Sequence, residues 1–150
     1  RSNAYIHELN TLAAAQGRTI NVHQVACPGL TDLVEQNQHD SPEAQVLVAQ
    51  YVHELFKPDS QIDQLLLGCT HYPLMLEVFR RYVPQHVTIV EQGKIVAQKL
   101  KDYLIRHQEI EKRLDQTGSR RSITTATDQN LKNLASKFYG SQIELEIMKR

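Results

Sequence analysis

The residues best suited to chemistry are a cysteine, a threonine and a histidine in direct succession. Cys69, Thr70 and His71 come directly after a glycine that ends the apolar run Leu65-Leu66-Leu67, and Pro73 lies just beyond them. A short apolar run bounded by glycine predicts a strand buried on both faces, and proline favours the first turn of a following helix. In open α/β sheets, ligands bind beyond the carboxyl ends of the strands, so these side chains are predicted to lie where a ligand binds.

This position suits a cysteine that acts as an acid or base. The free amides and the positive dipole end of a helix beginning near Pro73 favour an anion, such as a substrate carboxylate. The same field favours the thiolate form of Cys69, and His71 as an imidazolium would add to it. Gly68 would let the backbone turn tightly and approach a ligand. The residues alone also allow a second interpretation, in which Cys69 is a small packed side chain and His71 an ordinary surface or core histidine.

Composition and charge exclude several functional classes. The 150-residue chain has 17 basic and 17 acidic residues, so no basic excess indicates a nucleic-acid partner. No apolar run approaches the roughly 18 residues that a membrane span requires. The chain lacks both an initiator Met and the apolar core of a signal peptide, and we expect it to begin within a longer protein. Its two cysteines have neither disulfide-framework nor zinc spacing, which indicates reduced thiols and a cytoplasmic location.

Helical and strand patterns alternate along the chain and must position these residues. The order predicts an α/β fold with a parallel sheet flanked by helices. Predicted helices cover residues 2–16, 30–37, 40–56, 73–82, 91–115 and 127–138, and predicted strands cover residues 19–26, 65–67, 87–90, 123–126 and 142–147. Side chains predicted to face the core include Val46, Ala49, Val52 and Phe56 in the third helix, and Val96, Leu100, Tyr103 and Leu104 in the fifth.

Two residues outside the motif also deserve comparison. Glu35 is either an acid near the site or a solvated helix residue, and the residues alone leave that choice open. Cys27 also follows a predicted strand, but Pro28 removes one amide from the loop behind it, which favours a structural role. The histidines at positions 23, 39, 53, 86 and 107 share no ligand spacing, so we expect them at the surface.

The segment Leu66-Leu67-Gly68-Cys69-Thr70-His71-Tyr72-Pro73 resembles the second cysteine motif of glutamate racemases. Aspartate racemases are similar at Gly-Cys-Thr but usually carry Glu in place of His71. Weaker similarities extend over nearly the whole chain, at residues 2–5, 26–28, 33–35, 93–97 and 124–125. The chain departs from the family at Glu91-Gln92, where members usually have Asp followed by Ser or Pro. Because that position lies near the lobe crossover, we expect the departure to affect hinge geometry.

The resemblance implies a cofactor-independent isomerase that interconverts L- and D-glutamate for peptidoglycan synthesis. Two cysteines act on opposite faces of the substrate Cα, and Cys69 matches one of them. His71 matches the residue that assists this cysteine, Thr70 matches a substrate-binding residue, and Glu35 matches an acidic group at the same site. The implied partner is glutamate itself, with no metal, cofactor, nucleic acid or membrane, and a homodimer stays open.

The resemblance also implies that half of the catalytic apparatus lies elsewhere. The family's N-terminal Asp-Ser-Gly-rich motif and first Cys-Asn-Thr motif are absent from these 150 residues. Residues 1–90 are expected to form the second lobe, incomplete at its start, and residues 91–150 to return and complete the first lobe. We therefore expect the chain alone to be inactive. The alternatives are a related aspartate racemase and a non-catalytic α/β module that retains the motif, whereas a redox thiol protein is disfavoured by the lack of Cys-x-x-Cys.

Overall fold

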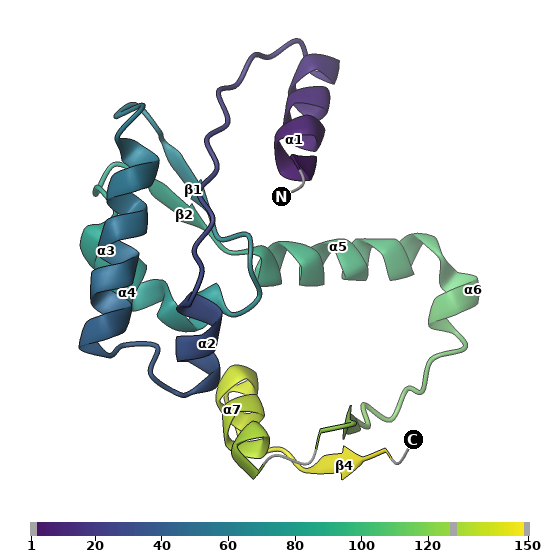
Figure 1. Cartoon of the computed structure of the whole chain (residues 1–150). Coiled ribbons are helices and arrows are strands. Elements are labelled where there is room, and N and C mark those ends of the chain that lie inside the picture. Colours follow the sequence, from purple (N-terminus) through teal and green to yellow (C-terminus); the bar gives the residue numbers. More distant parts are fainter. Residues whose placement is uncertain (1–2, 127–128, 149–150) are drawn as a thin grey trace.

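Helices alternate with short parallel strands along the chain. The computed structural model describes residues 3–126 and 129–148 (Figure 1). The elements are α1 (Ala4–Ala15), α2 (Leu30–Glu35), α3 (Pro42–Phe56), β1 (Gln64–Leu66), the 3-10 helix η1 (Tyr72–Met75), α4 (Leu76–Tyr82), β2 (Thr88–Val90), α5 (Gln92–Arg106), α6 (Gln108–Glu111), β3 (Ser122–Thr124), α7 (Gln129–Tyr139) and β4 (Leu145–Ile147). The predicted α/β class is confirmed. None of these helices is long and apolar enough to cross a membrane.

The hydrophobic core lies between the β1–β2 pair and the helices α2, α3 and α4. Each helix contributes side chains at spacings of three or four, which places them on one face. The largest side chains that are completely enclosed are those of Leu30, Val34, Val48, Met75 and Val78. The core therefore holds α2 and η1 together, and these are the elements that flank Cys69.

Strands β1 and β2 are parallel, with Leu65 opposite Ile89 and Leu66 opposite Val90. Leu65 and Leu67 point to the same side and are buried, whereas Leu66 points to the other side and is 39% exposed. The prediction that this run is buried on both faces is therefore wrong. Successive side chains of a strand point to opposite faces, and here the core covers only one of them.

Helix α3 begins where its sequence predicts. The Ser41 hydroxyl accepts a hydrogen bond from the Ala44 amide at 3.1 Å, and Pro42 occupies the first turn. The core-facing residues are Ala44, Val48 and Val52, whereas Val46 is 65% exposed. The prediction for Val46 is wrong because the buried stripe follows the spacing of four that starts at Ala44. The prediction for Val52 is confirmed.

The segment between α1 and α2 is not a strand. Gly17, with φ of 66°, ends α1 as expected, but residues 18–27 carry no regular secondary structure. A strand requires a hydrogen-bonded neighbour, and in the described residues the sheet of β1 and β2 has no third member. The predicted strand at residues 19–26 is therefore wrong. The predicted starts of two helices, at Ser2 and Thr127, lie outside the described residues.

The chain after β2 contributes no buried side chain among its described residues. The predicted helix at residues 91–115 divides at His107, whose φ of −118° and ψ of 63° end α5 before α6 begins. Val96, Leu100 and Tyr103 are exposed rather than inside, which contradicts their prediction. Strands β3 and β4 form a second parallel pair, separate from β1 and β2.

Figure 1 shows how these later elements are arranged. Helix α5 extends away from the β1–β2 pair, and the chain then returns so that α7 lies beside α2. A hydrogen bond from Lys137 Nζ to Asn37 Oδ1 at 3.0 Å joins α7 to the end of α2. This return brings a helix from the last quarter of the chain to the residues around His71.

Candidate active site

The loop that carries Cys69 joins the end of β1 to the helical turn η1. Leu67 is the last buried residue of the strand region, and the Tyr72 amide donates to the Cys69 carbonyl at 3.2 Å to close the turn. Pro73 lies in the first turn of η1, as predicted. The turn is a short 3-10 helix, so fewer free amides face the loop than the predicted α-helix would offer.

Gly68 is not required by the backbone conformation of this loop. Its φ lies outside the left-handed region, and an added Cβ would meet the Tyr5 ring at 3.9 Å, an ordinary contact distance. The prediction that a tight turn here relies on Gly68 is therefore wrong, and a close approach of this backbone to a ligand stays a prediction. Thr70 is exposed between Cys69 and His71, and its substrate-binding role stays a prediction.

Three of the predicted site residues form one connected series of side chains. The Cys69 sulfur lies 3.7 Å from Nδ1 of His71, and Nε2 of the same ring lies 3.3 Å from Oε1 of Glu35. Glu35 ends α2, so the core packing of α2 brings this carboxylate to a loop more than thirty residues away in sequence. The Thr31 hydroxyl, one turn earlier in α2, lies 4.0 Å from the same sulfur.

This arrangement suits the exchange of a proton at sulfur. A carboxylate beside Nε2 favours the tautomer that carries its hydrogen there, which leaves the Nδ1 lone pair facing the thiol. Nδ1 can then accept the thiol proton, and Glu35 stabilises the resulting imidazolium. The thiolate is the reactive form of cysteine, and it can take a proton from a bound molecule. Cys69 is half-buried, so its sulfur is neither enclosed in the core nor fully solvated.

Phe138 also contacts this series, and like Thr31 it was not predicted from the sequence. The Phe138 ring of α7 meets the His71 ring edge-on, with centroids 5.7 Å apart and planes at 89°. Together with Glu35 and His71, apolar residues of α7 and nearby segments line a cavity of about 650 Å³. The spacing of Leu131, Leu134 and Phe138 indicates an apolar helix face, but nothing in the sequence indicates that this face meets His71.

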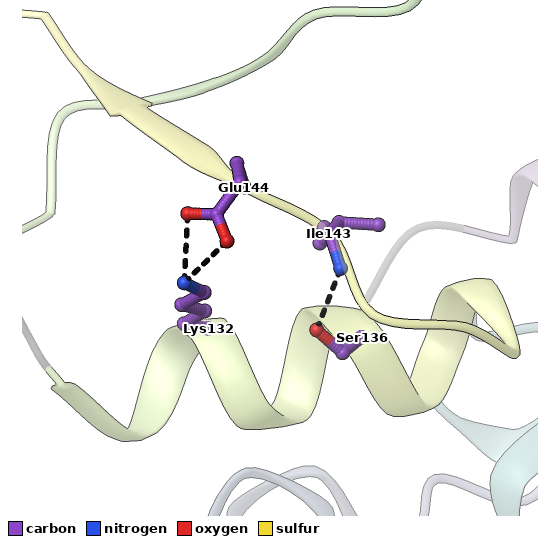
Figure 2. Close-up of polar contacts among 4 residues, drawn as sticks. All are labelled: Lys132, Ser136, Ile143 and Glu144. Atoms are coloured by element: carbon purple, nitrogen blue, oxygen red, sulfur yellow. Dashed lines mark hydrogen bonds and ion pairs between the residues drawn. The ribbon is translucent and has the colours of Figure 1, made fainter.

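Helix α7 is held in place by the segment that follows it (Figure 2). Lys132 Nζ pairs with both carboxylate oxygens of Glu144, at 2.9 and 2.7 Å. One turn along the helix, the Ile143 amide donates to the Ser136 hydroxyl at 3.2 Å. These contacts fix the helix against the approach to β4 and so hold its apolar face toward the cavity.

Cys27 lies close to the site but in a different environment. Its Sγ lies 3.8 Å from the Val25 carbonyl, and the Tyr72 hydroxyl donates to the Cys27 carbonyl at 3.4 Å. Burial raises the pKa of the Cys27 thiol, although a hydrogen bond from Tyr72 opposes this effect. Burial also raises the pKa of Tyr72. Both groups therefore favour their protonated forms, which supports the structural role predicted for Cys27.

The remaining histidines and acidic residues form no second centre in the part of the chain that the structure describes. No group of three or more His, Cys, Asp or Glu side chains there is arranged to hold a metal ion. His23 pairs with Asp59 at 3.4 Å, and His107 pairs with Glu109 at 3.1 Å. Nδ1 of His39 is buried without a hydrogen-bond partner. The surface position predicted for His39 is therefore only partly correct, because one of its ring nitrogens is buried.

Comparison with known proteins identifies relatives of the chain. No protein-family model matches it. It is 34% identical over 125 residues to a glutamate racemase of Roseobacter denitrificans, covering 83% of this chain and 44% of that protein. The crystal structure of the glutamate racemase isoform RacE1 from Bacillus anthracis superposes with a TM-score of 0.69 and 28% identity, covering 98% of this chain and 52% of that one.

A third comparison concerns the fold alone. The crystal structure of glutamate racemase from Francisella tularensis in complex with D-glutamate has a TM-score of 0.68 at 21% identity, over 82% of this chain and 45% of that one. The chain thus spans about half the length of the relatives it matches. In both its sequence and its fold, the chain is similar to about half of a glutamate racemase.

Proposed function

We propose that this chain is the C-terminal part of a glutamate racemase and that Cys69 is one of its two catalytic bases. The observation that carries the proposal is the series in which the Cys69 sulfur lies 3.7 Å from His71, and His71 lies 3.3 Å from Glu35. It stands just beyond the carboxyl end of β1, where ligands of α/β proteins bind. The substrate class is supported by the names of the relatives that the chain matches in sequence.

The proposed chemistry divides one inversion between two faces of the substrate. The Cys69 thiolate takes the proton from Cα, so a C–H bond breaks and an S–H bond forms. A second cysteine, outside these 150 residues, then gives its proton to the opposite face. A single base would tend to return the proton to the side it left, so two are required. In this chain, His71 moves the proton at Sγ, Glu35 stabilises the charged ring, and Thr70 binds the substrate.

The division of the chain into two lobes is part of the proposal. Residues 1–90 would form the second lobe and residues 91–150 would complete the first. Two observations support this boundary: the core cluster ends at Val87, and apolar side chains of α5 such as Val96 and Ile105 are exposed. Exposed apolar side chains on one helix mark a surface that another part of a protein covers. The N-terminal half of the enzyme is the proposed cover, and a homodimer remains a proposal for its assembly.

In the cell, the complete enzyme would supply D-glutamate for peptidoglycan and hence for cell-wall growth and shape. Its proposed location is the cytoplasm, with both thiols reduced and without a cofactor. His71 in the motif weighs against aspartate as the substrate. An assay with both amino acids as substrates decides between these two racemases.

The test compares two cysteine variants in a protein that unites this chain with the half carrying the Cys-Asn-Thr motif. Cys69→Ala should lower D-glutamate formation from L-glutamate by about 10²- to 10⁴-fold, the usual contribution of a positioned acid or base. Cys27→Ala is the matched control and should retain most of the activity. The 150-residue chain alone should form no D-glutamate.

Three results would count against the proposal. Full activity in Cys69→Ala would remove Cys69 from the mechanism, and D-glutamate formation by the 150-residue chain alone would contradict the division of the site. In the unsubstituted protein, iodoacetamide should react with Cys69 near neutral pH, and glutamate should protect it. A thiol that shows neither behaviour would indicate a non-catalytic module that only retains the motif.

A further inference from the structure

The side chain of Gln92 contacts the backbone just before the catalytic loop. Gln92 is the first residue of α5, and its Nε2 donates a hydrogen bond to the Leu67 carbonyl at 3.1 Å in a partly buried position. On its other side, the Leu67 amide donates to the Val90 carbonyl at 3.2 Å. Both backbone polar groups of Leu67 are therefore bonded, its amide to the last residue of β2 and its carbonyl to the first residue of α5.

This contact continues the β1–β2 ladder by one step. In a parallel pair, a residue whose amide bonds to one residue of the neighbouring strand offers its carbonyl to the amide two positions further on. For Leu67, which bonds to Val90, that donor would be the Gln92 backbone amide. Gln92, however, begins a helix after the extended Glu91, with φ of −98° and ψ of 130°. The side-chain amide therefore takes the position of the missing backbone donor.

The position of Leu67 makes this hydrogen bond relevant to chemistry. Leu67 is 3% exposed, so its carbonyl would be left without a partner in the core if the donor were removed. Cys69 follows only two residues later, and its distance to His71 depends on the path of this backbone. An amide of glutamine length provides both the reach and the donor.

We propose that Gln92 is a positioning residue for Cys69, through which the start of α5 holds the loop that carries the thiol. The inference rests on the proposed function. The proposed function gives Cys69 its catalytic role and makes α5 the start of the segment that returns to the first lobe. Gln92 then connects the arrangement of the two lobes with the distance between the Cys69 sulfur and the His71 ring.

The experiment uses three variants of the 150-residue chain. Gln92→Met keeps the length of the side chain and removes the donor. Gln92→Glu also removes the donor when ionised, and it places a negative charge against the Leu67 carbonyl. Gln98→Met is the matched control, since Gln98 lies on the same helix and its Nε2 donates to Asp102 Oδ1 at 2.8 Å on the exposed surface.

Two measurements report on the loop. Hydrogen exchange is followed in peptides that cover residues 67–72, and the iodoacetamide alkylation rate of Cys69 is followed by peptide mapping, which counts Cys27 separately. A neutral hydrogen bond contributes about 0.5–1.5 kcal/mol. Gln92→Met should therefore exchange about two- to tenfold faster in this loop and alkylate Cys69 more slowly near neutral pH, because the contact with His71 is occupied less often.

The pH dependence of Gln92→Glu shows whether residue 92 acts as a hydrogen-bond donor or only through packing. At about pH 8 its loop should exchange faster than that of Gln92→Met. Near pH 4, a carboxyl of ordinary pKa is about half protonated and can donate a hydrogen bond. The difference in exchange rate between Gln92→Glu and Gln92→Met should therefore shrink or reverse there. Equal exchange in Gln92→Met and Gln98→Met would overturn the proposal, and so would a Glu variant that matches the Met variant at every pH. Neither measurement needs substrate, so a failure of racemisation leaves this result interpretable.

Discussion

Replacing His71 with asparagine removes the imidazole beside Cys69 and keeps a polar side chain there. Asparagine can place an amide near the position of Nδ1, but it cannot be protonated or share charge with Glu35. A hydrogen bond to a charged group contributes about 1.5–3 kcal/mol. The Cys69 to His71 distance is 3.7 Å and the His71 side chain is 26% exposed, so the low end of this range applies. A loss of about 1.4 kcal/mol corresponds to about tenfold in a rate or population.

The assay is the second-order rate of iodoacetamide alkylation at Cys69, measured near neutral pH in the 150-residue chain. His71→Asn should react about tenfold more slowly than the unsubstituted chain. His86→Asn is the control, because His86 is exposed in the turn before β2. Glu35→Gln should slow the reaction by less than His71→Asn, since the Glu35 side chain is 58% exposed and water screens its charge.

If His71→Asn and His86→Asn both react within twofold of the unsubstituted chain, the imidazole does not activate the sulfur. The contact between Cys69 and His71 would then be one of packing alone. Equal urea midpoints for the three chains would show that the comparison is not confounded by unfolding.

Three predictions concern stability. Leu30→Ala should lower the free energy of unfolding by about 2–5 kcal/mol, because Leu30 is completely buried and the change leaves a cavity; Val46→Ala, at an exposed site, should cost less than about 0.5 kcal/mol. Ser41→Ala should cost about 1 kcal/mol through loss of the hydrogen bond that caps α3. Burial raises the pKa of Cys27 above its ordinary value of 9.0, so the stability that this thiol contributes is present below about pH 9 and is lost as the pH rises through the folded-state pKa. Cys27→Ala should therefore reduce the fall in urea midpoint between about pH 8 and about pH 10.

These predictions have their own contrary outcomes. If Val46→Ala lowers the free energy of unfolding as much as Leu30→Ala does, Val46 is buried and the core-facing side of α3 differs from the one described here. If Ala and Asn at position 41 give the same stability, the Ser41 hydroxyl does not act as a cap, since Asn can replace it in that role. If Cys27→Ala leaves the alkaline loss unchanged, other groups such as Tyr72 account for all of it.

Local signals in the sequence were reliable wherever neighbouring residues decide the structure. Ser41 and Pro42 predicted the start of α3, Gly17 the end of α1, and Pro73 the turn after the loop that carries Cys69. Each acts through its own hydrogen bond, φ angle or missing amide, which few distant contacts can override. The strand predicted at residues 19–26 failed because a strand depends on a neighbour, which its own sequence cannot specify.

The sequence by itself determined the α/β alternation, the motif at Cys69 and the family resemblance, because these depend on residue types and short spacings. Only the tertiary structure decided that Glu35 reaches His71, that Phe138 packs against the same ring, and that Gln92 holds the Leu67 carbonyl. It also decided that Val96 and Leu100 are exposed. The physical reason is the same in each case: these contacts join residues far apart in the chain, and hydrophobic burial, which has no direction of its own, determines which of them meet.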